Sequence, residues 1–287
     1  EGDGLPGLII DVYGRTAVLQ CHSIGMHRGR MQLAEALQRV LGPELEAVYD
    51  KSAEALPSAY GGGVKPAYLY GHSAPGMTHE NGLAFWVDWE SGQKTGFFLD
   101  QRDNRELLRR YAHGKTALNA FSYTGGFSVY ALAAGAVQVD SVDSSAKAME
   151  LAERNVSLNS MEPARHRGIV SDVPRFLQGA EPDHYDLMVV DPPAFAKSLE
   201  KRHNAVQAYK RLNALAMRKI RRGGILFTFS CSQVVDRELF YHTIVAAALE
   251  TGRPVRVLHH LRQPADHPVS LFHPEGEYLK GLVLEVG

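Results

Sequence analysis

Two side chains suited to chemistry each follow an apolar run in this 287-residue sequence. Cys231, between Ser230 and Ser232, follows ILFTF, and Asp191 follows LMVV and precedes Pro192-Pro193. A cysteine at the carboxyl end of a strand, with hydroxyls beside it, can supply a thiolate nucleophile, although a buried, inert thiol is an equal alternative for that residue alone. Two prolines fix the turn after Asp191 and remove two N–H donors. We therefore expect its carboxylate at the edge of a sheet.

Three further sites lie where earlier apolar runs end. Residues 119–133, NAFSYTGGFSVYALA, combine small residues and two glycines where a strand meets a helix, so a ligand can approach the backbone closely. The GxGxxG fingerprint is missing, which argues against a nicotinamide or flavin site. Asp143 ends the next strand, where an acid can accept hydrogen bonds from a ribose; a helix cap is the alternative. Asp172 ends the following strand and could hold an adenine edge.

Other catalytic classes find little support. His259, His260, His267 and His273 have neither HExxH nor a paired ligand spacing, so no metal site is expected. A Ser-His-Asp hydrolase would need a GxSxG elbow, which the sequence lacks. Cys21 has no polar setting and is interpreted as structural.

The elements that must position these residues alternate between strands and helices from about residue 101. The strands are almost continuously apolar, as expected when both faces of a sheet are covered. This pattern predicts a doubly wound, mainly parallel, seven-stranded Rossmann-like sheet of the α/β class over residues 97–287. The expected strands are 115–122, 137–145, 166–172, 185–193, 223–232 and a closing pair at 255–269 and 277–286; the expected helices are 105–112, 127–136, 146–160, 205–220 and 236–250.

Residues 1–96 are expected to form a smaller, β-rich α+β domain with a role in RNA docking. A hairpin turns at Tyr13-Gly14, and an amphipathic helix follows at 31–42. Residues 60–80, which include three consecutive glycines, are expected to be irregular. Residues 82–99 are expected to form two strands about a Ser91-Gly92 turn.

Composition narrows the class of protein. Apolar residues make up 45% and charged residues 22% of the chain, which excludes general disorder. The net charge of −1 excludes a protein held to nucleic acid by bulk charge. No bilayer-spanning run, secretory signal or cysteine framework is present, so a cytoplasmic protein without a membrane partner is expected. The start lacks an initiator Met, and we expect that a preceding segment has been removed.

The order of a glycine turn, an acid, a second acid and a DPP resembles that of the class I S-adenosylmethionine-dependent methyltransferases. Seven segments together are similar to the ribosomal RNA large subunit methyltransferase I family, which makes 5-methylcytosine in 23S rRNA. Members of that family usually carry an N-terminal PUA domain, which is absent here. The segments are DQRDNR (100–105), FSYTGGFSVYAL (121–132), SVDSS (141–145), DPPAF (191–195), TFSCS (228–232), PADHPV (264–269) and PEGEYLKG (274–281).

The resemblance implies a role for each matching residue. S-adenosylmethionine would be the cofactor and S-adenosylhomocysteine the product. Asp143 and Ser144 would take the ribose, Asp172 and its neighbour Val173 the adenine, and Gln101 and Arg102 would close the pocket. The methionine portion would lie on the loop residues Phe121, Ser122, Tyr123, Thr124, Gly125 and Gly126, and the cofactor would also contact Asp191 and Pro192.

The family's cytosine chemistry would make Cys231 the nucleophile. Thiolate attack at C6 makes C5 enamine-like, and Asp191, near N3 and the exocyclic amine, would stabilise the adduct. The base must be unpaired or flipped out. Many RNA cytosine methyltransferases have a second cysteine after the DPP, which this chain lacks. No side chain is therefore assigned to accept the C5 proton, and we expect a bound water or hydroxide to do so. Substrate-binding candidates are Pro193, Phe195, Lys197, Lys201 and Arg202.

The main alternative is methylation of another RNA atom, such as guanine N7. Nitrogen needs no covalent thiol, so Cys231 favours carbon. A catalytically inactive RNA-binding module and an NAD oxidoreductase are more remote alternatives. Residues 197–222 hold nine Lys or Arg against Glu200 alone, which predicts a basic strip for RNA phosphates beside the site, a solvated helix face being the alternative. The sequence leaves open whether the protein is a monomer or a homodimer.

Overall fold

Strands and helices alternate after residue 100 and form one compact unit. The residues before 100 form most of a second unit. In the computed structural model, which describes residues 2–287, the first unit comprises the chain up to Leu99 together with Pro268–Gly276, and the second comprises Asp100–His267 and Glu277–Gly287. The division thus falls three residues later than the sequence pattern indicates. The sequence also gave no sign that Pro268–Gly276, within the connection between the last two strands, groups with the first unit.

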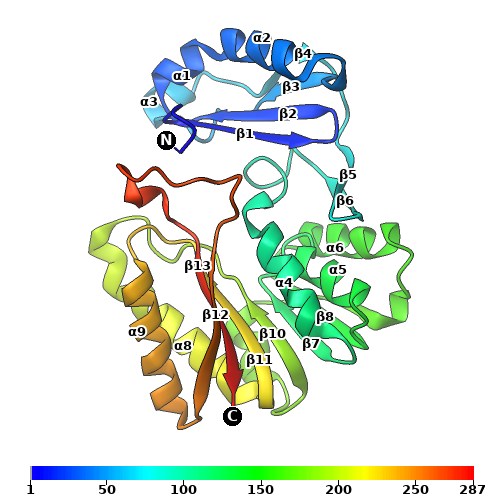
Figure 1. The fold of residues 1–287 in the computed structure, drawn as a ribbon, viewed down its shortest axis with the longest axis vertical. Coiled ribbons are helices and arrows are strands. Elements are labelled where there is room, and N and C mark those ends of the chain that lie inside the picture. Colours follow the sequence, from blue (N-terminus) through cyan, green and yellow to red (C-terminus); the bar gives the residue numbers. More distant parts are fainter. Residues whose placement is uncertain (1) are drawn as a thin grey trace. The chain divides into compact units, whose positions relative to one another are not determined.

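The second unit is built on a seven-stranded sheet in the order β12-β13-β11-β10-β7-β8-β9 (Figure 1). The five strands from β11 to β9 are parallel, and β13 runs antiparallel to both β11 and β12. The predicted α/β fold with a mainly parallel sheet and a closing pair of strands is confirmed. The strands are β7 (Thr116–Ala120), β8 (Gln138–Asp143), β9 (His166–Val170), β10 (Tyr185–Val190), β11 (Ile220–Ser230), β12 (Val255–Arg262) and β13 (Lys280–Val286).

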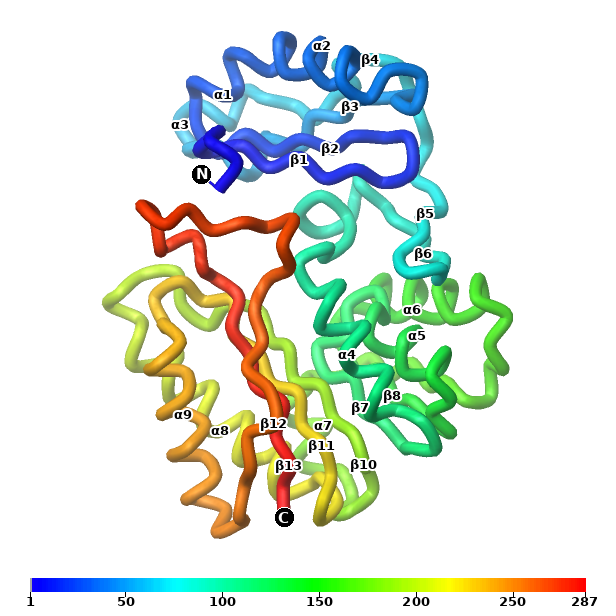
Figure 2. Tube along the Cα trace, viewed as in Figure 1, coloured from blue at the N-terminus to red at the C-terminus, as the bar shows by residue number. Residues whose placement is uncertain are grey.

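Six helices pack on this sheet in two groups, one on each face, as the chain path in Figure 2 shows. Helix α5 contacts α4 and α6, and helix α8 contacts α7 and α9. The second group buries Leu177, Tyr209 and Phe240 against the apolar strands. The helices are α4 (Arg102–Ala112), α5 (Gly126–Ala133), α6 (Ala146–Leu158), α7 (Val173–Gly179), α8 (Arg202–Lys219) and α9 (Arg237–Thr251).

The strand order reverses between β7 and β10, because the chain continues outward from β7 to β8 on one side and resumes at β10 on the other. In open α/β sheets a ligand binds outside the carboxyl ends of the strands at this reversal. The carboxyl end of β7 leads into Phe121–Gly126, and that of β10 into Asp191. The topology therefore brings two of the predicted sites to one place.

The first unit contains a four-stranded sheet, β1-β2-β3-β4, and a separate β5-β6 hairpin. The hairpin at the start of the chain and the amphipathic helix after it are confirmed. Leu19, Ala34 and Val48 belong to its apolar core. Its elements are β1 (Leu8–Tyr13), β2 (Thr16–Cys21), α1 (Ile24–Arg28), α2 (Arg30–Leu41), β3 (Ala47–Asp50), α3 (Ser58–Gly61), β4 (Ala67–Gly71), β5 (Gly76–Glu80) and β6 (Leu83–Val87).

Two predictions for this unit are wrong. Residues 60–80 contain β4 and β5 and are not irregular. The hairpin turns at Asn81-Gly82, where φ is 50° and 79°, and not at Ser91-Gly92. Asn-Gly is the strongest short hairpin signal, because both residues tolerate positive φ. Within residues 2–287, no helix is long and apolar enough to cross a membrane.

Candidate active site at the carboxyl edge of the sheet

The loop after β7 adopts a backbone that L-residues rarely take up. Phe121, Tyr123 and Gly125 have φ values of 59°, 45° and 77°. Such conformations cost free energy at residues other than glycine and persist where the surroundings hold them, often at ligand sites. Phe121 packs against the sheet core, and Tyr123 packs against Ala148 and its neighbours on α6. Packing of Phe121 and Tyr123 therefore stabilises the strained backbone of this loop.

Gly125 lets the loop lie directly on helix α6. A Cβ on Gly125 would lie 2.9 Å from the Cβ of Ala152 and 3.2 Å from its Cα. The loop is also tied to α6 by Asn155, whose Nδ2 donates to the carbonyl of Thr124 at 2.9 Å. Gly125 is the N-cap of α5, so the free N–H groups of the first turn of α5 begin at this loop.

Asp143 joins the end of β8 to the loop after β7. Its Oδ2 accepts a hydrogen bond from the Tyr123 N–H at 3.0 Å, and its Oδ1 accepts one from the Ser145 N–H at 3.0 Å. The side chain is half-buried, and the neighbouring Ser144 is exposed. Because a carboxylate has about four acceptor positions, both oxygens can still accept a hydroxyl. The predicted ribose acid and the predicted glycine loop therefore meet.

Asp172 serves as the N-cap of α7. Its Oδ1 accepts a hydrogen bond from the Arg175 N–H at 3.0 Å. The Asp172 side chain is exposed, whereas Val173 is buried in the core. The capping role does not require a ligand, since Asp is a favoured N-cap in any helix.

A chain of amide hydrogen bonds orients Asp191. Gln101 Nε2 donates to Asp191 Oδ2 at 2.9 Å, and Asn104 Nδ2 donates to Gln101 Oε1 at 2.7 Å and to the Arg262 carbonyl at 3.3 Å. Gln101 and Asn104 are both buried. Sequence reasoning missed Asn104, although its spacing of three from Gln101 at the start of one helix was a usable signal.

Arg102 lies at the surface beside this chain. Its Nη1 is 2.7 Å from Asp266 Oδ2 and its Nε is 3.5 Å from Asp103 Oδ1. Against the desolvation that would raise it, hydrogen bonds from Arg102 and His267 hold the pKa of Asp266 below its usual value. Arg102 is thus already engaged with acids on its own unit.

Cys231 follows the last residue of β11 and lies beside the turn after β10. Its Sγ is 4.0 Å from the carbonyl oxygen of Pro192, and the side chain is half-buried. Ser232 Oγ donates to the carbonyl of Ala196 at 2.7 Å, which ties the Cys231 turn to the segment after Asp191. The two residues predicted to be catalytic therefore lie at neighbouring strand ends.

Phe195, the aromatic residue predicted to bind substrate, takes part in packing near this turn. Phe195 packs on the buried Tyr209, with 4.7 Å between ring centroids and 57° between ring planes, and is half-buried. Burial is the main reason that the pKa of Tyr209 is raised to about 12, so its hydroxyl stays protonated. Pro192 is buried, and Pro193 is exposed at the surface.

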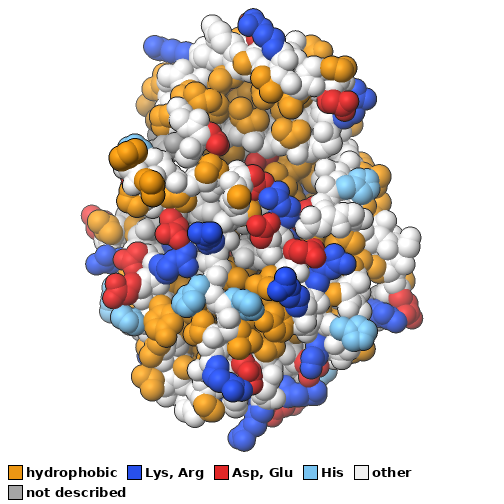
Figure 3. Space-filling model, in the orientation of Figure 1, with side chains coloured by type: hydrophobic (Ala, Val, Ile, Leu, Met, Phe, Trp, Pro, Cys, Tyr) orange, Lys and Arg blue, Asp and Glu red, His pale blue; other side chains and the backbone are white. Residues whose placement is uncertain are grey.

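Six cations of the predicted basic strip form two groups at opposite ends of α8, while Lys210 and Arg211 lie in the middle of this helix and Arg222 lies in β11. The carboxyl-edge basic group is exposed, in or next to the segment that links β10 to α8. The amino-edge basic group lies near the start of β11 and has local partners: Glu250 at 3.0 Å, the Ala180 carbonyl at 2.5 Å and Asp186 at 2.6 Å. The carboxyl-edge basic group is Lys197, Lys201 and Arg202, and the amino-edge basic group is Arg218, Lys219 and Arg221. Figure 3 shows basic and acidic side chains interspersed on the face drawn, in keeping with the near-neutral net charge.

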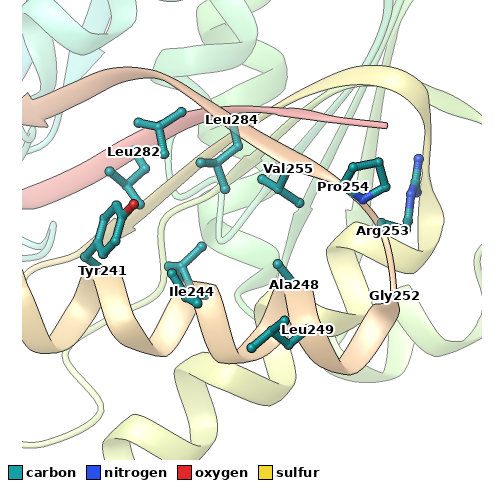
Figure 4. A pocket seen from close by; sticks show the side chains of 12 residues that line it. Tyr241, Ile244, Ala248, Leu249, Gly252, Arg253, Pro254, Val255, Leu282 and Leu284 are labelled. Atoms are coloured by element: carbon teal, nitrogen blue, oxygen red, sulfur yellow. The ribbon is translucent and has the colours of Figure 1, made fainter.

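A separate cavity of about 490 Å³ lies between α9 and the strands β12 and β13 (Figure 4). Its wall is mainly apolar and includes Ile244, Val255 and Leu284. None of the residues predicted to be catalytic or to bind cofactor or substrate lines this cavity.

Comparison with known proteins identifies the family. A model of the S-adenosylmethionine-dependent methyltransferases matches residues 68–268. A ribosomal RNA large subunit methyltransferase I from Escherichia coli O139:H28 is 41% identical over the whole chain, which covers 73% of that relative. The chain belongs to the ribosomal RNA large subunit methyltransferase I family. It is therefore an S-adenosylmethionine-dependent methyltransferase, as its motifs predict.

Two solved structures share the fold of this family member. A chain from Streptococcus mutans, assigned as an S-adenosylmethionine-dependent methyltransferase, has a TM-score of 0.85 at 27% identity, with 100% of this chain and 73% of that chain covered. The protein SMU.776, solved in complex with SAH, has the same TM-score and identity, with 99% and 73% covered. Likeness to these chains extends over both units.

The residues at the carboxyl edge fit the cofactor of the family. S-adenosylmethionine carries an amino acid group, a ribose diol and an adenine. The N–H groups at the start of α5 and the carboxylate of Asp143 match a ligand with an anionic group and vicinal hydroxyls. All of them lie at the strand-order reversal, where the fold predicts a ligand.

Proposed function

We propose that this protein transfers a methyl group to C5 of a cytosine in 23S rRNA, with Cys231 as the covalent nucleophile. The main support for this proposal is the position of Cys231. Its half-buried Sγ lies 4.0 Å from the carbonyl oxygen of Pro192, beside the turn that follows Asp191. The rRNA substrate is taken from the name of the relatives, which are ribosomal RNA large subunit methyltransferases.

The cofactor would bind at the reversal of strand order. When bound, S-adenosylmethionine supplies an electrophilic methyl group on a sulfonium. The loop Phe121–Gly126 would hold the amino acid portion, Asp143 with Ser144 the ribose, and Asp172 with Val173 the adenine. Gln101 and Arg102 would line the same pocket, which Asp191 and Pro192 would complete. The hydrogen bonds of Asp143 to the loop support this arrangement, because they pre-order both parts before the ligand arrives.

The thiol would solve the chemical difficulty of the target carbon. Cytosine C5 is a weak nucleophile within an aromatic ring. When Cys231 Sγ bonds to C6, the ring electrons move to C5, which then takes the methyl group. The C5 proton leaves to water, its bonding electrons re-form the C5–C6 double bond, and the Sγ–C6 bond breaks, which restores the ring and the thiolate. Asp191, held by Gln101, would hydrogen-bond the base and stabilise the adduct.

The RNA would approach over the exposed segment between β10 and α8. The carboxyl-edge basic group would contact phosphates, and Pro193 and Phe195 would border the base. The exposure of these cations supports the proposal, since exposed Lys and Arg can pair with phosphates as counterions leave. The amino-edge basic group is already paired with acids and carbonyls of the protein and is not assigned to RNA.

Nucleoside mapping tests the proposal. Undermodified 23S rRNA is incubated with the protein and isotope-labelled S-adenosylmethionine, digested to nucleosides and analysed by mass spectrometry. We expect label in 5-methylcytidine. Label in 7-methylguanosine would contradict the choice of atom, and transfer at the full rate by Cys231→Ala would contradict the covalent route. Asp191→Asn, which keeps the shape of the side chain, serves as the matched second variant and should slow transfer.

A further inference from the structure

A buried lysine holds the turn that carries the proposed nucleophile. Lys280, the first residue of β13, pairs in register with Ser230, the residue before Cys231. Its Nζ donates hydrogen bonds to the carbonyls of Ser232 and Val235, at 2.7 and 2.6 Å. Both acceptors belong to the turn that leaves Cys231, and Lys280 is only 2% exposed. Burial of an ammonium costs free energy, which hydrogen bonds such as these offset in part.

The charge of Lys280 acts on the thiol. Burial lowers the pKa of Lys280 to about 8, and the charges of Cys231 and Asp236 oppose that fall, with Cys231 the larger of the two. Arg237 and Glu277 also face it and form an ion pair with each other. Asp236 is engaged as the N-cap of α9, where it accepts from a backbone N–H. With a pKa of about 8 the ammonium is largely charged at neutral pH.

We propose that Lys280 is a positioning residue for the nucleophile: it fixes the turn that carries Cys231 and favours the thiolate over the thiol. The inference rests on the proposed function, since a thiolate matters only if Cys231 attacks the base. A thiolate is the reactive form of cysteine, and an opposite charge nearby, in surroundings poor in water, stabilises it. Because Lys280 is buried, it acts through Cys231 and its turn without touching RNA or cofactor.

Alkylation of Cys231 measures this effect without substrate or cofactor. The rate of iodoacetamide labelling of the Cys231 peptide is followed by mass spectrometry against pH in the full chain. Lys280→Met removes the charge and keeps the aliphatic stem, so we expect the pH midpoint of labelling to rise by on the order of one unit. Lys280→Arg retains the charge and should keep the midpoint near that of the wild type.

The chain supplies its own controls. Lys219→Met removes another ammonium bonded to two backbone carbonyls, those of Gln178 and Ala180, at the opposite end of α8. It should leave the midpoint unchanged. Thermal unfolding followed by circular dichroism reports that a variant is folded, because the buried Cys21 belongs to the first unit and Lys280 to the second. Should Lys280→Met lose its cooperative transition, Lys280→Gln, whose amide can still donate to a carbonyl, replaces it in the same assay.

The outcomes separate this inference from the proposed function. A folded neutral variant whose midpoint stays at the wild-type value would overturn the role of Lys280. In methyl transfer, a folded Lys280→Met enzyme should show a lower kcat with KM for RNA and cofactor unchanged; a raised KM alone would also overturn it. Full activity of Cys231→Ala would instead refute the nucleophile, whatever the labelling midpoint.

Discussion

Replacing Gly125 by Ala tests whether the loop after β7 needs close contact with α6 as well as a left-handed backbone. Gly125 has a φ of 77°, and an added Cβ would lie 2.9 Å from the Cβ of Ala152 and 3.2 Å from its Cα. Both atoms of Ala152 belong to a buried part of a helix, so they cannot move as the end of a flexible side chain can. The substitution therefore combines two separate costs.

The magnitude follows from adding these costs. A left-handed backbone costs an L-residue about 1–2 kcal/mol, and an extra methyl group in a packed interior costs about 1–3 kcal/mol. We expect Gly125→Ala to reduce the free energy of unfolding by roughly 2–5 kcal/mol, which corresponds to at least about 4 °C in Tm for a protein of this size.

Gly252→Ala is the matched control. Gly252 has a φ of 67° at the C-cap of α9, and a Cβ there would meet no atom within 4 Å. This variant therefore carries only the backbone cost of about 1–2 kcal/mol. Circular dichroism is the suitable probe of unfolding, because Trp86 and Trp89 both belong to the first unit and would report on the wrong part of the chain.

Cofactor binding separates the two variants further. Titration calorimetry with S-adenosylmethionine should show at least a tenfold weaker Kd for Gly125→Ala and an unchanged Kd for Gly252→Ala. Ala152→Gly, which removes the opposing methyl group, should recover part of the loss when combined with Gly125→Ala. Equal losses of stability in the two glycine variants, or wild-type affinity in Gly125→Ala, would refute the reasoning.

Three further predictions address the ribose acid, a buried histidine and the RNA surface. Asp143→Asn should weaken S-adenosylmethionine binding about tenfold or more in calorimetry, because the loop loses a charged acceptor; unchanged affinity would contradict the assignment. Burial lowers the pKa of His166 in the folded protein. On acidification this histidine therefore takes up a proton in the unfolded chain before it does so in the folded one, and the free energy of unfolding decreases as the pH falls below about 6.5. His166→Gln should flatten the dependence of the urea midpoint between about pH 7.5 and 5.5, and an equally steep dependence would exclude this residue. Neutralising the carboxyl-edge basic group should reduce the slope of log affinity for RNA against log salt by about 2; the same change in the amino-edge basic group should not.

Much of the second unit could be predicted because its signals are local. The apolar runs and the acids at their ends were visible in the sequence, and parallel strands bring their carboxyl ends to one edge. The meeting of Asp143 with the loop at Tyr123 follows from adjacent strands, β7 and β8, in one βα series. Position in such a series was enough to place the glycine loop, Asp143, Asp191 and Cys231 together.

Other contacts depend on packing that no local pattern encodes. Lys280 stands in the sequence as one cation beside an apolar strand, and only the pairing of β13 with β11 brings it to the turn that carries Cys231. Phe195 was expected beside the base, yet its ring also packs on Tyr209, whose burial depends on α8. The run of cations at 197–222 predicts a single basic strip, but an 18-residue helix separates its two ends by the height of the sheet.

The β5-β6 hairpin of the first unit turns at the stronger of two local turn signals. Asn81-Gly82 precedes the apolar run LAFWV, and its mirror-image turn geometry suits a two-residue connection better than Ser91-Gly92 does. The chain after β6 is held instead by side chains: the Asp88 carboxylate accepts from the Ser91 N–H at 2.8 Å, and the Tyr13 hydroxyl donates to the Phe97 carbonyl at 3.0 Å. Side-chain bonds of this kind leave no period in the sequence.

Covalent trapping tests the proposed mechanism most directly. Fluorine at C5 of the target cytosine cannot leave as a proton does, so a methylated adduct on Cys231 cannot release its thiol. With 23S rRNA that contains 5-fluorocytidine and S-adenosylmethionine, we predict a protein–RNA complex that survives denaturation, with the RNA fragment on the Cys231 peptide and no complex for Cys231→Ala. Methylated RNA without any such complex would contradict the covalent role of Cys231.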